Sequence, residues 1–194
     1  MDEVFYYTVK AISEGFYKEK GSKFLGFAHP VNSKDEIKLV LDGYKKQYYD
    51  ARHVCFAYAL GFKGEDTRVY DDGEPGHSAG DPILGQINSF NLTNVLVVVI
   101  RYFGGTKLGV GGLVTAYKTA AEEALKNAII IKRIPTEVVK HMFSYEEMNR
   151  VMGIVKQYDL EIESQDFKIT CEIKLLVPLA LVEVVTAKLK SEYA

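Results

Sequence analysis

The sequence contains few cysteines and no long apolar run, and each shortage excludes a class of protein. Cys55 and Cys171 are the 2 cysteines among 194 residues, and they match neither a disulfide framework nor the paired spacing of a zinc site. No apolar stretch approaches the roughly 18–20 residues that span a bilayer. The first residues, Met-Asp-Glu-Val, lack the basic and apolar segments of a signal peptide. We therefore expect a cytoplasmic protein without a membrane segment.

The overall charge does not indicate a nucleic-acid partner. The formal net charge is −2, whereas polynucleotide-binding domains are typically basic. Residues 1–134 contain 17 Lys and Arg against 16 Asp and Glu, and residues 135–194 contain 7 against 10. A site for a polyanion would therefore be a local patch in the first part of the chain.

Hydrophobic periodicity predicts an α+β chain with two domains, residues 1–134 and 135–194. The run 94–103 is apolar on both faces, as in a central strand covered from both sides, and Ser33 is a plausible N-cap for the helix that follows it. The first two strands are expected to form a hairpin. In the first domain the predicted strands are 4–11, 22–31, 53–60, 68–70 and 94–103, and the predicted helices are 33–48, 79–90 and 109–127.

The second domain is predicted to have the order βαββα. Its expected strands are 138–145, 160–163 and 169–177, and its helices are 146–158 and one that Pro178 opens. This order is that of a ferredoxin-like domain without its usual final strand. Few residues remain after Lys190, so we expect that strand to be absent or supplied from elsewhere.

A glycine-rich segment lies between the apolar strand and the next helix and contains Gly104, Gly105, Gly109, Gly111 and Gly112. Glycine is used where φ is positive or where a ligand must approach the backbone. The segment fits neither a dinucleotide-binding fingerprint nor a P-loop. Two cations, Arg101 and Lys107, accompany it. This combination predicts an anion site at a helix N-terminus, although the glycines could also serve only to let the helix cross tightly over the sheet.

An acidic turn, residues 71–74, precedes this segment. A guanidinium at the end of a buried strand must be paired or must face a ligand. Asp71, Asp72 and Glu74 are therefore the expected partners of Arg101, and a direct ligand contact is the alternative. The turn lacks the spacing of a calcium loop, so no metal site is predicted there.

Two further groups of residues invite functional hypotheses. His53 and Cys55 share one face of a strand and could contact one pocket with His77, but neither a base-activated nucleophile nor a zinc site is complete. We predict no catalytic residue, metal ligand or cofactor, and expect His53 and Cys55 to be packed in the core or to form a pocket wall. The lysines of segment 16–24 alternate with aromatic residues, which suits phosphates and stacked bases but also suits edge protection.

With these residues in view, the chain resembles the IMPACT/YigZ family. The resemblance covers essentially the whole sequence and is most specific at residues 80–84 (Gly-Asp-Pro-Ile-Leu) and 98–109 (Val-Val-Ile-Arg-Tyr-Phe-Gly-Gly-Thr-Lys-Leu-Gly). The pair His53 and Cys55 and the run 72–75 (Asp-Gly-Glu-Pro) also match. Thr115 departs from the pattern, because the family often has an arginine there, and one anion contact would then be missing.

The resemblance implies a particular architecture and a role. The N-terminal domain should resemble the second domain of a small-subunit ribosomal protein, with a left-handed βαβ crossover that the usual handedness rule would not predict. The C-terminal domain should be ferredoxin-like and similar to the last domain of translocating elongation factors. Both folds recur in RNA- and ribosome-binding proteins, so the family is expected to act in translation. Eukaryotic relatives have an extra N-terminal domain, so we do not expect this protein to share their mechanism.

Three functions follow as hypotheses. The first is a non-enzymatic protein that binds RNA or the ribosome and modulates translation. Arg101, Lys107 and the amides of residues 104–112 would contact phosphate, with His53, Asp72 and Glu74 shaping the groove. The second is an enzyme or sensor that holds a small phosphorylated ligand or nucleotide in the same groove. The third is a protein-interaction module whose C-terminal sheet receives a partner.

Overall fold

The computed structural model describes residues 4–168 and 170–191, which divide into two compact units. Phe5–Arg133 form the larger unit, and Val4 with the described residues from Ile134 onward form the smaller one. The larger unit is built on a five-stranded sheet with the order β2-β3-β6-β4-β5. Its strands are β2 (Ser13–Glu19), β3 (Ser22–Pro30), β4 (His53–Leu60), β5 (Asp66–Tyr70) and β6 (Val95–Tyr102).

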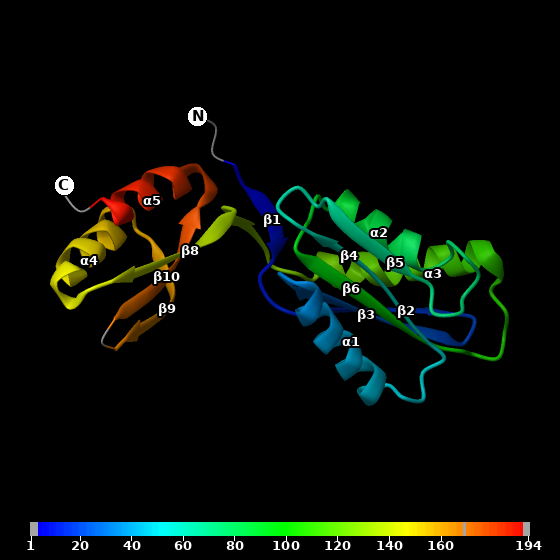
Figure 1. Ribbon diagram of the computed structural model, residues 1–194. Helices are drawn as coiled ribbons and strands as arrows, with labels where there is room; N and C mark the ends of the chain where they lie inside the picture. Colours follow the sequence, from blue (N-terminus) through cyan, green and yellow to red (C-terminus); the bar gives the residue numbers. More distant parts are fainter. Residues whose placement is uncertain (1–3, 169, 192–194) are drawn as a thin grey trace. The chain divides into compact units, whose positions relative to one another are not determined.

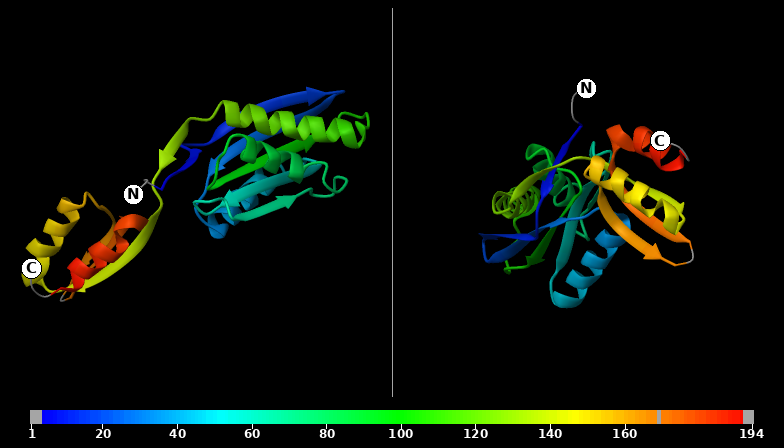
Figure 2. Two further views of the ribbon diagram at one scale, coloured as in Figure 1. Left: turned by 90° about the horizontal axis from the view of Figure 1, so that it is seen from above. Right: turned by 90° about the vertical axis from the view of Figure 1, so that its left-hand side faces the viewer.

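Three helices cover the two faces of this sheet (Figures 1 and 2). Helix α1 (Lys34–Gln47), which Ser33 caps by accepting a hydrogen bond from the Glu36 amide, packs on one face. Helices α2 (Gly80–Ser89) and α3 (Gly109–Lys126) pack on the other. Central strand β6 is buried on both faces, as its continuous apolar sequence predicts.

The helix placement requires one left-handed crossover. All neighbouring strands of the sheet are antiparallel, so β3 runs parallel to β4, and β5 runs parallel to β6. The connection through α1 and the connection through α2 pass in opposite directions across the sheet and on opposite faces. Because the two strand pairs also run in opposite directions, the two crossovers have opposite hands. One of them is therefore left-handed, as the family resemblance implied and against the usual preference.

The predicted pairing of the first two strands is wrong. Strand β1 (Tyr6–Val9) pairs with β7 (Ile130–Arg133), a strand that the sequence pattern did not indicate. The hairpin partner of β3 is β2, which begins at Ser13. The turn between them places Lys20 at φ 46° and Gly21 at φ 83°, and two consecutive positive φ values characterise tight hairpin turns that match the twist of the strands.

The smaller unit has the predicted βαββα order. It contains β8 (Thr136–Phe143), a short 3-10 turn (Tyr145–Glu147), α4 (Met148–Gln157), β9 (Glu161–Phe167), β10 (Cys171–Pro178), a second 3-10 turn (Leu179–Leu181) and α5 (Val182–Lys190). The strand order is β8-β10-β9, all antiparallel. Pro178 ends β10 and is the N-cap of the 3-10 turn that leads directly into α5. Ile169, the predicted first residue of β10, lies outside the described residues.

Strand β8 is an edge strand among the described residues, because it pairs with β10 alone. Its outer edge is where a ferredoxin-like domain would place its fourth strand. No helix in the described part of the chain is long and apolar enough to cross a membrane.

Candidate phosphate-binding site

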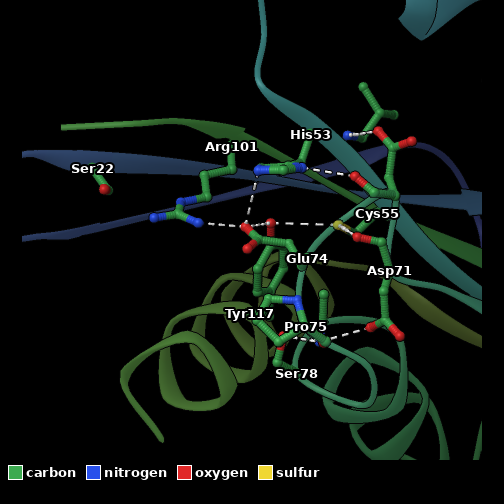
Figure 3. A network of polar contacts seen from close by, with 12 residues as sticks. Ser22, His53, Cys55, Asp71, Glu74, Pro75, Ser78, Arg101 and Tyr117 are labelled. Atoms are coloured by element: carbon green, nitrogen blue, oxygen red, sulfur yellow. Dashed lines mark hydrogen bonds and ion pairs between the residues drawn. The ribbon is translucent and has the colours of Figure 1, made fainter. Parts of the chain in front are cut away.

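A buried carboxylate, Glu74, lies at the centre of a polar network at one end of the larger sheet (Figure 3). Its Oε1 accepts a hydrogen bond from Arg101 Nη1 at 2.5 Å and one from the Tyr117 hydroxyl at 2.8 Å, and His53 Nε2 lies 3.6 Å away. The Glu74 and Arg101 side chains are 4% and 6% exposed. A carboxylate at this depth needs such donors to remain charged. Glu74 is thus the partner of Arg101 among the three acids that the sequence offered.

Strand register brings these groups together. His53, the first residue of β4, lies directly opposite Arg101 of β6, and Arg101 lies opposite Phe24 of β3. These side chains share the sheet face that α3 covers, and α3 contributes Tyr117. The Arg101 guanidinium lies 5.5 Å from the centroid of the Phe24 ring and 5.6 Å from that of Phe103, within the range of cation–π attraction.

The other two acids of the turn position the backbone. Asp71 accepts hydrogen bonds from the amides of His77, Ala79 and Gly80 at the start of α2. Burial alone would raise the pKa of Asp71, but these hydrogen bonds hold the pKa below its usual value. Asp72 Oδ2 accepts a hydrogen bond from the Val54 amide at 2.7 Å. The turn therefore uses its carboxylates on protein donors.

The Asp72 backbone also orients His53. The Asp72 carbonyl oxygen lies 2.7 Å from His53 Nδ1, and because a carbonyl only accepts, Nδ1 carries the proton. The Nε2 side of the ring is thereby directed toward Glu74 (Figure 3). Asp72 thus acts on the groove through His53 and does not line it.

Cys55 lies beneath this network and is completely buried. Its Sγ donates to the Asp71 carbonyl at 3.0 Å and lies 3.4 Å from the Tyr117 hydroxyl. Burial raises the pKa of the Cys55 thiol far above neutrality, so the thiol is protonated, which does not suit a nucleophile. His77 is exposed and pairs with Asp81 instead of joining His53.

The glycine-rich segment has two structural roles. Gly104 packs against the β2–β3 turn, where a Cβ on Gly104 would lie 1.9 Å from the Gly21 carbonyl carbon. Gly105 and Gly109 have φ of 87° and 72° and have open space around them. Helix α3 then begins at Gly109 without a side-chain cap and without an acidic residue in its first turn. Free amides at an uncapped helix start attract anions.

Beside this helix start lies a groove of about 530 Å³. Arg101 Nε, also buried, has no hydrogen-bond partner among the described residues. Lys107 and Arg52 are exposed at the groove and form no ion pair within the described part of the chain. The groove is lined by Arg52, His53, Glu74, Pro75, Arg101, Phe103, Lys107, Leu108, Gly109, Val110 and Leu113.

The lysines of the β2–β3 hairpin lie at the same end of the sheet. Lys18 and Lys23 are directly opposite each other across the two strands, and Lys20 is at the tip. Like charges placed opposite each other destabilise a strand pair. All three are exposed, and none forms an ion pair within residues 4–168 and 170–191. The hairpin tip contacts Gly104. Lys23 lies opposite Tyr102, one residue away from the pair of Phe24 and Arg101. Lys23 and its partner Lys18 therefore point to the α1 face of the sheet, and only Lys20 at the tip lies beside the glycine-rich segment.

The structure gathers only part of the predicted site around one space. Arg101, Lys107, His53, Glu74 and Gly109 line the groove, whereas Gly104, Gly105, Gly111, Gly112 and Asp72 do not. No sequence pattern singles out Arg52, Phe103 or the Tyr117 hydroxyl as part of the site. Within the predicted helix 109–127, helical spacing puts Tyr117 on the same face as Leu113 and Ala120, and all three are buried. A buried tyrosine usually needs a hydrogen-bond partner for its hydroxyl, which was the available signal.

The fold and the groove define a class: an α+β protein with an arginine–glutamate pair beside a glycine-rich helix start. The Impact N-terminal domain family model matches residues 20–125. The chain is 31% identical over 152 residues to IMPACT family member YvyE of Bacillus subtilis, covering 78% of this chain and 70% of that protein. Over 142 residues it is 39% identical to an IMPACT family member of Thermus thermophilus, covering 73% and 76%. The chain belongs to the IMPACT family, which confirms the resemblance.

One solved structure agrees with the fold. A crystal structure of a hypothetical protein has a TM-score of 0.76 and 27% identity to this chain, covering 97% of this chain and 92% of that one. The two-domain translational regulator Yih1 is 28% identical over 63% of this chain, with a TM-score of 0.37.

Proposed function

We propose that this protein is a non-enzymatic RNA- or ribosome-binding protein that modulates translation, and that it holds phosphate in the Arg101 groove. The observation that carries the proposal is the Arg101 guanidinium, buried in the groove with Nη1 on Glu74 and Nε without a partner among the described residues. A buried cation group that is only partly satisfied favours an anionic ligand. The role in translation follows from the family resemblance.

The surroundings of Arg101 suit a phosphate that belongs to a longer chain. Glu74 neutralises Arg101 in part, so the additional attraction must come from Lys107, Arg52 and the uncapped start of α3. Outside the groove, the exposed Lys20 at the tip of the β2–β3 hairpin, which contacts Gly104, provides a further cation. An isolated phosphate would contact only the groove, whereas a polynucleotide backbone would contact the groove and the cation at the hairpin tip.

The test is a fluorescence-anisotropy titration of a labelled structured RNA at several salt concentrations. Log affinity should fall linearly with log salt, because phosphate contacts release counterions. Arg52→Ala combined with Lys107→Ala should weaken binding and reduce the salt slope by about 1 for each lost phosphate contact. Both residues are exposed, so the double variant should fold, and Arg101 is left in place because Glu74 depends on it.

The matched control is Lys10→Ala with Lys63→Ala. This variant has the same change in charge, and both residues are exposed and outside the groove. It should bind RNA with the wild-type affinity and salt slope. Equal affinities for all three proteins, or no binding of RNA or ribosomes at low salt, would refute the proposal.

A second candidate function, a protein-interaction module, is favoured by the open edge of β8. Val138 and Met142 on this strand are 45% and 58% exposed. The opposite edge strand, β9, contains Glu161, Glu163 and Asp166 and a register shift against β10. Charged residues and bulges protect sheet edges, so β8 is the less protected edge and could receive an extended partner strand.

Charges added to β8 would test this candidate. Val138→Lys with Met142→Lys should abolish capture of a specific partner without changing RNA affinity. Val184→Lys is the control, because Val184 is an exposed apolar residue of the same unit that lies on helix α5. A partner that binds all three proteins equally would show that β8 is not the docking edge.

A further inference from the structure

The groove beside Arg101 also has an apolar part, which a bound phosphate would not contact. Phe103 and Val110 line it and are 50% and 56% exposed, and Leu113 forms part of its floor. Large exposed apolar side chains that converge on one recess mark a ligand site more often than an accidental surface. The cations and helix amides described above lie on the same recess, so it combines an apolar wall with an anion-binding end.

We propose that this recess binds one unpaired nucleotide, with its base stacked on Phe103 and its phosphate at Arg101, Lys107 and the start of α3. The inference rests on the proposed function and narrows it from RNA in general to RNA with an unstacked base. Aromatic side chains supply stacking platforms for single-stranded bases. The volume of about 530 Å³ lies within the range of small-ligand pockets.

The shape of the site distinguishes an unpaired nucleotide from a duplex. A duplex presents its phosphates on a convex surface and keeps its bases stacked inside, so a patch of exposed cations is enough to bind it. Sequence-specific RNA recognition instead uses splayed bases that stack on aromatic rings. Phe103 follows the end of β6 directly, and its ring lies 5.6 Å from the guanidinium carbon of Arg101. A base on this ring would therefore have its own phosphate within reach of the cations.

The experiment compares a short labelled RNA single strand with the same strand annealed to its complement, by anisotropy at one salt concentration. Wild-type protein should bind the single strand more tightly. Phe103→Leu retains the apolar character of the wall but removes the ring, and should weaken single-strand binding about tenfold while leaving duplex binding unchanged. Phe5→Leu is the control, since Phe5 is 44% exposed and does not line this groove.

The outcomes separate this inference from the proposed function. If the duplex binds at least as tightly as the single strand, and Phe103→Leu has no effect, the unpaired-nucleotide inference is overturned. The proposed function then survives only if Arg52→Ala with Lys107→Ala still weakens binding. If neither short RNA binds, the unpaired-nucleotide inference fails, whereas the proposed function fails only if the structured RNA and ribosomes also do not bind.

A competition titration with nucleoside monophosphates identifies the source of the nucleotide. Weak competition, with a far higher affinity for the strand, supports a nucleotide within RNA. A monophosphate that binds as tightly as the strand overturns the RNA assignment and supports the alternative of a free small ligand.

Discussion

The two faces of the five-stranded sheet are packed by opposite means. The α1 face is filled with aromatic rings from both the strands and the helix, among them Phe27, Tyr44, Phe56 and Tyr58. On the α3 face, glycines of β2 and β3 meet alanines of the helix. A Cβ on Gly26 would lie 2.3 Å from the Ala120 carbonyl oxygen. Helix α3 thus rests on the strand backbone, whereas α1 rests on side chains.

This difference matters for the site because α3 begins there. Backbone contact leaves little freedom in the position of α3, and close-packed interiors transmit any displacement. The start of α3 is therefore held in place relative to Arg101 on β6. On the other face, the larger side chains leave a groove of about 430 Å³ between α1 and the β4–β5 pair. The face with the small residues is the face that positions the candidate site.

The largest loss of stability is expected when the ion pair on the α3 face is broken. Arg101→Met leaves the Glu74 carboxylate buried without its cation, and removing one partner of a buried pair costs about 3–5 kcal/mol. Urea unfolding should measure this loss. The double variant Arg101→Met with Glu74→Gln should recover much of it, and a double variant as unstable as Arg101→Met would argue against an unpaired charge as the cause.

The next effect tests the close contact of α3 directly. Gly26→Ala should destabilise the protein by about 1–3 kcal/mol, because the added methyl group meets helix backbone that cannot move independently. The measurement is again urea unfolding. A loss below a few tenths of a kcal/mol would mean that α3 can shift away from the sheet.

A smaller effect concerns pH and the α1 face. His29 Nε2 lies 2.6 Å from the Tyr44 hydroxyl within the aromatic core, and burial lowers the pKa of His29 below the ordinary 6.5. As the pH falls, His29 therefore binds a proton more readily in the unfolded chain than in the folded protein. This contribution to stability should be complete above about pH 6.5 and lost as the pH falls through the lower folded pKa. His29→Gln should flatten the pH dependence of the unfolding free energy over that interval.

The smallest effect has the opposite sign and sharpens the comparison between the faces. Gly43 lies within α1, and a Cβ there would have no neighbouring atom within 4 Å. Gly43→Ala should stabilise the protein by about 0.5–1 kcal/mol, because alanine loses less backbone freedom than glycine in a helix. In thermal unfolding, the melting temperature should therefore rise for Gly43→Ala and fall for Gly26→Ala.

The sequence predicted those elements whose pattern is local. Alternation placed β4 at its observed bounds, and helical spacing with Ser33 placed α1 within one residue at each end. Prediction from the sequence failed where pairing with a distant strand decides the structure. Strand β7 exists because β1 pairs with it, and nothing within Ile130–Arg133 indicates that partner.

The candidate site was predicted in the same uneven way. Burial energetics required an acid for Arg101, and the turn 71–74 supplied Glu74. The sequence did not decide between three acids, because the choice depends on how the turn folds, with Asp71 on the α2 amides and Asp72 on the Val54 amide. The contact of the hairpin tip with Gly104 depends on the register of β3 against β6, which no local spacing reveals.

That contact fixes the length of the β2–β3 turn. Exposed hairpin tips usually tolerate inserted residues, and engineered tags are often placed in them. Here the Gly104 amide donates to Ser22 Oγ at 3.1 Å, directly after the tip. One added residue between Lys20 and Ser22 would either push the glycine-rich segment aside or leave this hydrogen bond unmade. Among relatives of this chain, variation in length should therefore be rare at this turn, although the turn lies at the surface.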